Sequence, residues 1–288
     1  MIRDAETSVP VIERCRVLGV ARSGYYAWRR RPLSTRAEAD ARLLQRIRRI
    51  HVETAAKYGR PRVYRELRAL GIRCGEKRVG RLRRIAGLRA VYPAPYRVTT
   101  EGTAEAQAAN HLGRRFAVGE QPGLNRVWSA DLTYLWTGEG WLFLAVILDL
   151  ASRRVVGWSV RPRMDQELTL SALRMAIAQR RIPTRGERLH HSDRGRQYTA
   201  LAYQQLLANV GFTPSLSRHA NCYDNAVSES FFATLRKELV HRTTFPSRCV
   251  ASREVIAFIE NWYNRRRRHS SLNYLSPVDY EREVHHIE

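Results

Sequence analysis

The sequence predicts a mixed α/β domain preceded by an all-helical region that contains a helix-turn-helix. Three observations support this fold class. Before residue 92 apolar residues recur three and four positions apart, whereas from Val127 they alternate with period two. A continuous apolar run then covers residues 142–148. Helical and strand patterns alternate after residue 166, which indicates a sheet with helices on its faces.

The helical region contains two amphipathic runs, each followed by a glycine. The runs are Val63, Leu67 and Leu70 before Gly71, and Val79, Leu82 and Ile85 before Gly87. A glycine after the last periodic residue is a helix stop signal. Two such helices with a glycine-containing break predict a helix-turn-helix. Residues 9–30 predict a further helix, turn and short helix.

The second region begins with three predicted strands. Residues 127–134 alternate, residues 142–148 form a strand buried on both faces, and residues 154–160 return after a turn at 149–152. The elements expected after them are a helix at 166–180, a strand at 188–191, a helix at 199–209, a strand at 212–215 and long helices at 224–241 and 252–266. We therefore expect a DNA-binding region at 1–92, a Pro- and Gly-rich linker at 93–125, a catalytic core at 126–280 and a tail at 281–288.

The charge of the chain favours a nucleic-acid partner. The formal net charge is +23, and residues 1–122 hold 27 Lys/Arg against 11 Asp/Glu, whereas residues 123–288 hold 23 against 16. Such an excess is stabilised when a polyanion binds to it. A membrane partner is not expected, because no apolar run approaches the roughly 20 residues that span a bilayer. The first residues contain no apolar signal-peptide core, so we expect a cytoplasmic protein.

The four cysteines do not predict a zinc site. Cys15, Cys74, Cys222 and Cys249 are scattered and form no C-x-x-C pair. Scattered cysteines of this kind fit a reduced, cytosolic protein.

Three carboxylates are the candidate catalytic residues. Asp131 lies within a predicted strand, Asp193 follows another strand, and Glu229 lies in the first turns of a helix. Taken singly, each has an ordinary interpretation: a solvent-exposed edge residue, a turn former, and a favourable charge at a helix N-terminus. Together they can hold two Mg²⁺ ions, which prefer oxygen ligands and catalyse in-line phosphoryl displacement as a pair. Without metal, these like charges should raise one another's pKa.

Four segments carry a resemblance to a known family. They are WSADLTYLWTGEGWLFLAVILDLASRRVVGWSV at 128–160, HSDRGRQYT at 191–199, NCYDNAVSESFFATLRKEL at 221–239 and YNRRRRHSSLNYLSP at 263–277. With GVARSGYYAWRRRP at 19–32 and YGRPRVYRELRALGI at 58–72, they resemble the second-frame product, OrfB, of the IS-three insertion-sequence family. Arg196 and Ala220 depart from its usual small polar residue and glycine.

The resemblance implies a ribonuclease-H-like integrase catalytic core with a D, D-35-E triad, and 35 residues do separate Asp193 from Glu229. It implies a bacterial, nucleoid-associated DNA transposase that cleaves insertion-sequence ends and transfers a 3′-OH onto target DNA. The implied cofactor is a pair of Mg²⁺ ions, with Mn²⁺ as a substitute. The implied partners are double-stranded DNA at the ends and target, further copies in a multimer on DNA, and an upstream-frame helix-turn-helix and leucine-zipper protein, present separately or as a fusion.

Basic residues near these motifs are the candidate DNA contacts. They are Arg78, Arg81, Arg83 and Arg84 in the second helix of the helix-turn-helix, Arg236 seven positions after Glu229, and Arg265, Arg266, Arg267 and Arg268. His191 and Asn225 flank the triad residues in sequence and are candidates for substrate contact. Asp149 is interpreted as a turn residue that forms a surface pair with Arg153 or Arg154.

Two other function classes stay open from the sequence. The chain could be a catalytically silent, sequence-specific DNA-binding regulator derived from a transposase, although all three carboxylates are present. It could also be a ribonuclease H or a retroviral-type integrase. The helix-turn-helix argues against the former, and the absence of an H-x₃-H…C-x₂-C zinc module argues against the latter.

Overall fold

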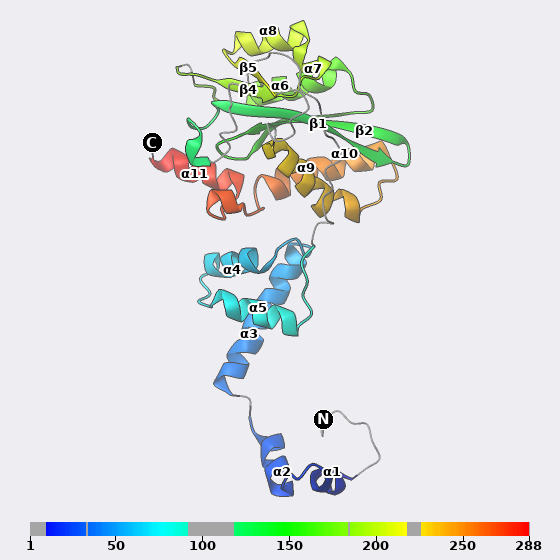
Figure 1. Ribbon diagram of the computed structural model, residues 1–288, viewed down its shortest axis with the longest axis vertical. Coiled ribbons are helices and arrows are strands. Elements are labelled where there is room, and N and C mark those ends of the chain that lie inside the picture. Colours follow the sequence, from blue (N-terminus) through cyan, green and yellow to red (C-terminus); the bar gives the residue numbers. More distant parts are fainter. Residues whose placement is uncertain (1–9, 33, 92–117, 184, 218–225, 288) are drawn as a thin grey trace. The chain divides into compact units, whose positions relative to one another are not determined.

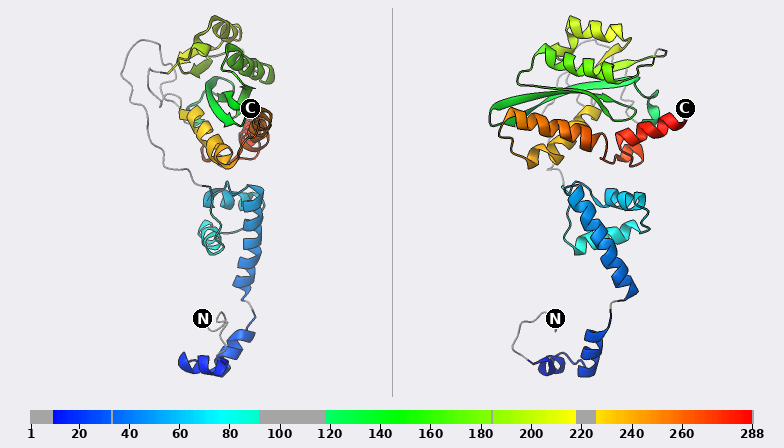
Figure 2. Two further views of the ribbon diagram at one scale, coloured as in Figure 1. Left: turned by 90° about the vertical axis from the view of Figure 1, so that its right-hand side faces the viewer. Right: turned by 180° about the vertical axis from the view of Figure 1, so that it is seen from behind.

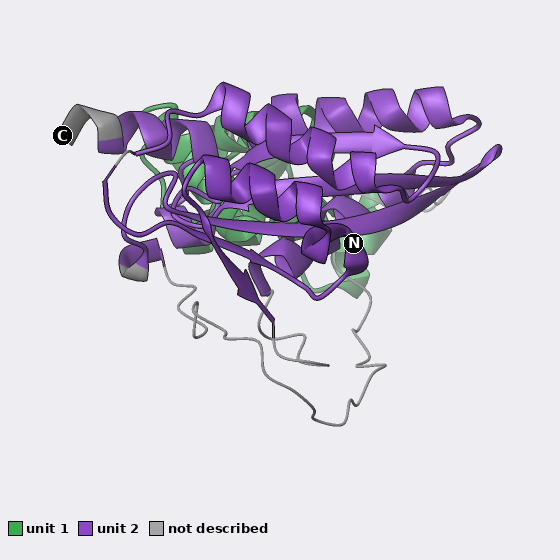
Figure 3. Ribbon diagram, turned by 90° about the horizontal axis from the view of Figure 1, so that it is seen from above, with its two compact units in different colours: residues 1–89 green, residues 90–288 purple. Residues whose placement is uncertain are grey.

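The computed structural model describes residues 10–32, 34–91, 118–183, 185–217 and 226–287. The chain divides into two compact units, residues 1–89 and 90–288, which Figure 3 colours separately. Most of the expected linker at 93–125 lies outside the described residues. Its last part contains a 3₁₀ turn, η1 (Val118–Glu120).

The first unit is all-helical. Its helices are α1 (Val11–Val17), α2 (Arg22–Arg30), α3 (Thr35–Glu53), α4 (Arg60–Ala69) and α5 (Glu76–Ile85). The predicted helix-turn-helix corresponds to α4 and α5, and the predicted short helices correspond to α1 and α2. Gly71 ends the helical segment of α4 with a φ of +74°, and the backbone N–H of Ile72 donates to the carbonyl of Leu67 at 2.9 Å. Only glycine adopts this left-handed conformation without steric cost, which explains the stop at this residue.

The longest helix of this unit, α3, is missing from the sequence prediction. Ser34 caps it, because its hydroxyl accepts from the backbone N–H of Ala37 at 3.2 Å. Leu43, Ile47 and Ile50 are buried along one stripe of the helix. These positions are four and three residues apart, so the helical signal was present but lies among many charged residues.

The second unit contains a five-stranded mixed sheet in the order β3-β2-β1-β4-β5 (Figure 1). Its strands are β1 (Val127–Thr137), β2 (Gly140–Asp149), β3 (Val155–Arg161), β4 (Leu189–Ser192) and β5 (Thr213–Leu216). The first three form an antiparallel meander, whereas β4 pairs parallel to β1, and β5 pairs parallel to β4. All five strands agree with the sequence prediction.

Helices cover both faces of this sheet. One face carries α6 (Gln166–Gln179), α7 (Arg196–Thr199) and α8 (Leu201–Asn209), as Figures 1 and 2 show. Trp128 of β1 stacks on Phe212 within the core of this face, with ring centroids 4.6 Å apart. Gly157 allows α6 to lie directly on β3, because a Cβ atom there would fall 2.3 Å from the carbonyl oxygen of Ala172.

The C-terminal helices cover the opposite face (Figure 1). They are α9 (Ala226–Glu238), the 3₁₀ turn η3 (Val240–Arg242), α10 (Arg248–Ala257), which continues as the π-helix η4 (Phe258–Tyr263), the 3₁₀ turn η5 (Ser270–Leu272), and α11 (Pro277–Ile287). The boundary expected after residue 280 falls inside α11. Glu281 is buried there and binds Arg180 and Arg154, so this helix is part of the core.

Candidate active site

The strand β1 holds Asp131 near the middle of its length. Asp131 pairs with Val146 of β2, whereas the pairing of β1 with β4 is confined to residues 127–129. On the β4 side, Asp131 therefore lies beyond the paired part of β1. Its side chain is half-buried, and its Oδ1 accepts from the backbone N–H of Leu132 at 2.8 Å.

The other two carboxylates come from the neighbouring elements. Asp193 directly follows β4, and its Oδ1 accepts from the backbone N–H of Gly195 at 2.9 Å, which fixes the turn into α7. Glu229 lies exposed in the first turn of α9, where the helix dipole favours a negative charge. Two strands and one helix thus present the three predicted residues.

The three carboxylates interact electrostatically. The pKa of Asp131 is raised to about 7, mainly by burial; the negative charges of Asp193 and Glu229 contribute to the increase, while the hydrogen bond from Leu132 and the charge of Arg236 oppose it. Partial desolvation also raises the pKa of Glu229. An unusually high carboxyl pKa in a group of acidic side chains is typical of functional sites.

The described residues contain no three His, Cys, Asp or Glu side chains gathered closely enough to form a ready-made metal site. The chemistry of the donors nevertheless suits a hard divalent cation, because all three groups offer carboxylate oxygens. Three like charges repel one another, and a bound cation would offset that repulsion.

Two contacts attach α9 to β1 on either side of Asp131 along the strand. The hydroxyls of Ser129 and Ser228 lie 2.8 Å apart, and both side chains are buried. The guanidinium of Arg236 donates to the hydroxyl of Thr133 at 3.0 Å. Ser129, Asp131 and Thr133 alternate along the strand and therefore share one of its faces. Arg236, predicted to bind phosphate, thus lies on the face of β1 that carries Asp131.

His191 is not positioned to contact substrate as predicted. Its ring is fully buried, and its Nδ1 and Nε2 atoms each lie 3.0 Å from a hydroxyl, those of Ser215 and Ser217. These bonds connect the end of β4 to β5 and the residue that follows it. The other predicted substrate contact, Asn225, lies outside the described residues.

Asp149 is also different from its prediction. It is fully buried, and its carboxylate accepts from the backbone N–H groups of Asn125, Ala151 and Ser152. Arg154 instead binds Glu281 at 2.6 Å. The predicted surface ion pair is therefore wrong: Asp149 holds a buried turn together through the backbone.

The four arginines of α5 fall into three groups. Arg84 is exposed, as a DNA contact must be. Arg78 and Arg81 both bind the carboxylate of Asp40 on α3, and these hydrogen bonds hold the pKa of Asp40 below its usual value. Arg83 is buried and donates to the carbonyl of Tyr58 at 3.1 Å, so its prediction as a DNA contact is wrong.

The four arginines at 265–268 also differ in their exposure and in their contacts. Arg265 and Arg266 are exposed. Arg267 is buried, forms a 3.0 Å ion pair with Glu238 and lies over the ring of Tyr263, so it supports the fold and does not face DNA. Arg268 donates to the carbonyl of Tyr274 at 3.0 Å.

Sequence reasoning missed the residues that place these side chains. Ser129, Ser228 and Glu238 lie within the segments that carry the resemblance, and Asp40 lies outside them, but neither residue type nor spacing singles out any of the four. The alternation that made Asp131 visible also put Ser129 on the same face, but only the packing of α9 shows what that hydroxyl meets.

Comparisons with known families define the class of protein. An "Integrase core domain" family model matches residues 121–222, and a second model of that description matches residues 210–277. An "HTH-like domain" model matches residues 38–96, which cover most of α3 and all of α4 and α5. The chain thus combines a helix-turn-helix-like unit with an integrase core, in agreement with the predicted fold class.

Curated relatives cover nearly the whole chain. The transposase InsF for insertion sequence IS3A of Escherichia coli (strain K12) is 40% identical over 284 residues, which are 96% of this chain and 95% of the relative. An uncharacterized 31 kDa protein of insertion element IS600 from Shigella sonnei is 40% identical over 274 residues, 95% of this chain and 99% of the relative. The chain belongs to the IS3 family of insertion-sequence transposases.

Among solved structures, the catalytic core domain of BIV integrase matches with a TM-score of 0.41 and 17% identity, over 57% of this chain and 97% of that one. This likeness is loose, and the fold class rests on the strand order and the family models. Within the described residues, no helix combines the length and the apolar character needed to cross a membrane.

Proposed function

We propose that this transposase is a metal-dependent enzyme in which Asp131, Asp193 and Glu229 hold two Mg²⁺ ions, replaceable by Mn²⁺. The observation that carries the proposal is that β1, the end of β4 and the start of α9 each present one carboxylate, and that the charges of Asp193 and Glu229 both act on Asp131. All three positions hold the acidic residue that the site needs. A silent DNA-binding regulator would not need these charges.

When bound, the metal pair would stabilise the attacking and leaving oxygens of a phosphoryl displacement, first for cleavage at an insertion-sequence end and then for attack by the 3′-OH on target DNA. The residues of this chain supply the oxygen ligands, with Asp131 on the strand as the central one. Arg236 adds a positive charge on the same strand face, where it can hold a phosphate of the DNA.

We assign DNA binding to both units of the chain. The helical region 1–92 would bind an insertion-sequence end through α5, whose exposed Lys77, Arg81 and Arg84 follow one helix face. The exposed Arg265 and Arg266 would contact the backbone of DNA bound to the catalytic core, which we place at 126–287 beyond a linker at 93–125. The active form would be a multimer on paired ends, with an upstream-frame leucine-zipper partner or as its fusion, at the bacterial nucleoid.

Substitution of Asp131 tests the catalytic assignment. Asp131→Asn removes the negative charge of one ligand and keeps its shape, so it should abolish Mg²⁺-dependent cleavage and strand transfer on a duplex that copies the insertion-sequence ends. Binding to the same duplex should persist. Glu187→Gln removes an exposed carboxylate just before β4 and is the matched control. Cleavage near the wild-type rate by Asp131→Asn would contradict the proposal.

A further inference from the structure

The first two helices of the chain form a motif to which the proposed function gives no role. The helices α1 and α2 are in contact and are joined by residues 18–21. Gly19 in this turn has a φ of +62°, and the backbone N–H of Val20 donates to the carbonyl of Cys15 at 2.9 Å. Two helices joined by a turn of about four residues that contains glycine are the pattern of a helix-turn-helix. This pair lies outside the HTH-like match, which begins at residue 38.

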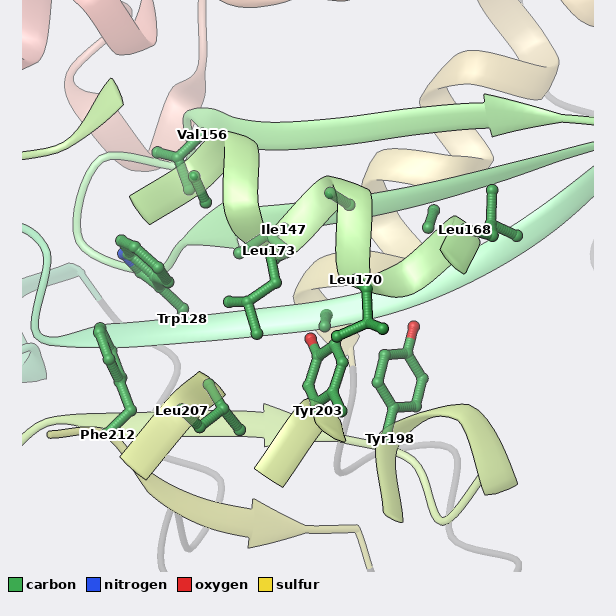
Figure 4. Close-up of a cluster of buried hydrophobic side chains, with 14 residues drawn as sticks. Trp128, Ile147, Val156, Leu168, Leu170, Leu173, Tyr198, Tyr203, Leu207 and Phe212 are labelled. Carbon is green, nitrogen blue, oxygen red and sulfur yellow. The ribbon is translucent and has the colours of Figure 1, made fainter. Parts of the chain in front are cut away.

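The pair buries little of its own surface. Its buried residues are Cys15 on α1 and Tyr25 on α2, whereas the core of the second unit gathers large side chains such as Trp128 and Leu173 (Figure 4). Figure 1 shows α2 inclined to α1 rather than parallel to it. Most of the surface of α2 is therefore open to a partner.

The charge of the motif fits a nucleic acid. Residues 10–32 contain six arginines and a single acidic residue, Glu13. Arg22 and Arg30 are exposed at the two ends of α2, and the sequence of α2 contains no Asp or Glu. A short helix that is basic at both ends, with nothing acidic between them, matches the electrostatics of a DNA-binding surface.

The face of α2 that points away from its buried side suits the major groove. Helical periodicity places Ser23, Ala27 and Arg30 opposite Tyr25, and all three are exposed. The small side chains of the first two allow the helix to approach base edges closely, and the hydroxyl of Ser23 can donate to a base or accept from it. In a helix-turn-helix, the N-terminal residues of the second helix contact the bases. Arg30 at the other end can bind a phosphate.

The apolar surface of the motif lies on a different side. Val17 and Trp28 are exposed apolar side chains of the pair. The ring of Trp28 lies beside that of Tyr25, with centroids 6.1 Å apart, so it belongs to the side of the buried residue and not to the face of Ser23. The face with Ser23 is therefore polar and basic, which favours DNA over an apolar protein partner at that face.

We propose that α1 and α2 form a second helix-turn-helix, in which α2 enters the major groove of an insertion-sequence end at a segment separate from the one that α5 binds. One chain then contacts an end at two places, and the second contact is intramolecular, which increases affinity beyond that of either helix alone. This inference rests on the proposed function, because it takes the insertion-sequence end as the DNA that the helical region binds.

The experiment measures binding by the full-length protein to a fluorescent duplex that copies one insertion-sequence end, with metal chelated so that no cleavage occurs. Ser23→Glu places a negative charge on the exposed face of α2, in the first turn, where the helix dipole favours it and DNA phosphates repel it. Anisotropy should show binding weakened about 10-fold or more. Hydroxyl-radical footprinting should show one protected segment lost while another persists.

Two further variants complete the design. Arg30→Ala tests the same face without adding a negative charge, and it should lower the slope of log affinity against log salt by about one. Thr35→Glu is the matched control, because it adds the same charge at the exposed first position of α3. It should bind the duplex like wild type and give the same footprint.

Wild-type affinity and footprint in Ser23→Glu would overturn the inference, and a change in the sedimentation of Trp28→Ala would then assign the motif to contacts between chains. Equal weakening by Thr35→Glu would also overturn it, because added negative charge alone would explain the loss. Arg84→Ala, measured in parallel, separates these results from failure of the proposed function. If that variant also binds like wild type, the assignment of DNA binding to the helical region fails; if it binds more weakly, only the role of α2 is decided.

Discussion

The hydroxyls of Ser129 in β1 and Ser228 in α9 lie 2.8 Å apart. Ser129 lies two residues before Asp131, and Ser228 lies one residue before Glu229. This buried contact links the strand and the helix that carry two of the three carboxylates. With the bond from Arg236 to Thr133, it helps to set the relative position of those two carboxylates.

Replacement of Ser129 should destabilise the catalytic core. Ser129→Ala removes the partner of the buried Ser228 hydroxyl, and leaving such a group unsatisfied costs about 1–3 kcal/mol. Urea unfolding of the single variants and of Ser129→Ala/Ser228→Ala should show a double variant that loses less than the sum of the two. Ser230→Ala, at an exposed position of α9, is the control. Strictly additive losses would argue against the contact.

The buried His190 should make stability depend on pH. Its pKa is lowered to about 3, mainly by burial and in part by His191, whereas an unfolded histidine titrates near 6.5. Below about pH 6.5 the unfolded chain therefore takes up a proton that the folded chain refuses. The contribution of neutral His190 to the free energy of unfolding is complete above about pH 6.5. It decreases by about 1.4 kcal/mol per pH unit as the pH falls toward 3.

A variant separates this effect from the other titrating groups. Between pH 6.5 and 5, the unfolding free energy of His190→Gln should fall less steeply than that of wild type. The difference in slope should be about 1.4 kcal/mol per pH unit. Urea unfolding at several pH values measures both slopes. Parallel slopes for the two proteins would show that His190 does not contribute.

Arg267 and Arg265 should affect different properties: Arg267 the stability of the fold, and Arg265 the binding of DNA. Arg267→Ala leaves Glu238 buried without its ion-pair partner, which should cost about 3–5 kcal/mol of unfolding free energy. Arg265→Ala should leave stability unchanged and, if Arg265 contacts a phosphate, reduce the salt dependence of DNA binding by about one counterion. Equal stability losses in the two variants would contradict this division.

The same contrast applies to α5. Arg84→Ala should weaken binding to duplex DNA and lower the slope of log affinity against log salt by about one, with no change in stability. Arg83→Ala should lower stability, because it removes the buried hydrogen bond to Tyr58. Fluorescence anisotropy at several salt concentrations and thermal unfolding measure the two effects. A salt slope that falls in Arg83→Ala but not in Arg84→Ala would reverse the assignment.

The strands and most helices were predictable because their signals are local. The alternation of β1 and the glycine stops after α4 and α5 depend only on neighbouring residues. The helix α3 escaped prediction because its apolar stripe is narrow within a highly charged segment. The site prediction depended on the resemblance, since no single carboxylate differs from an ordinary turn or helix residue.

The burial or exposure of each polar side chain was not predictable, because it depends on contacts between distant segments. His191, Asp149, Arg83 and Arg267 are polar residues beside functional motifs, where exposure is the ordinary expectation. Each is buried with partners from another part of the chain. Residue type and spacing therefore did not separate the basic residues that stay exposed from those that support the core.

The parallel pairing of β4 with β1 has a consequence for the order of events during synthesis. The meander β1–β2–β3 closes between neighbours in sequence, whereas the partner of Val127 on β4 is Leu189, about sixty residues later, and Glu229 follows later still. Domains generally fold as units, N-terminal first, as the ribosome releases them. A growing chain thus completes its helical unit well before its third carboxylate has been translated. Under the proposed function, the chain in that interval has its DNA-binding unit but only part of its catalytic carboxylate set.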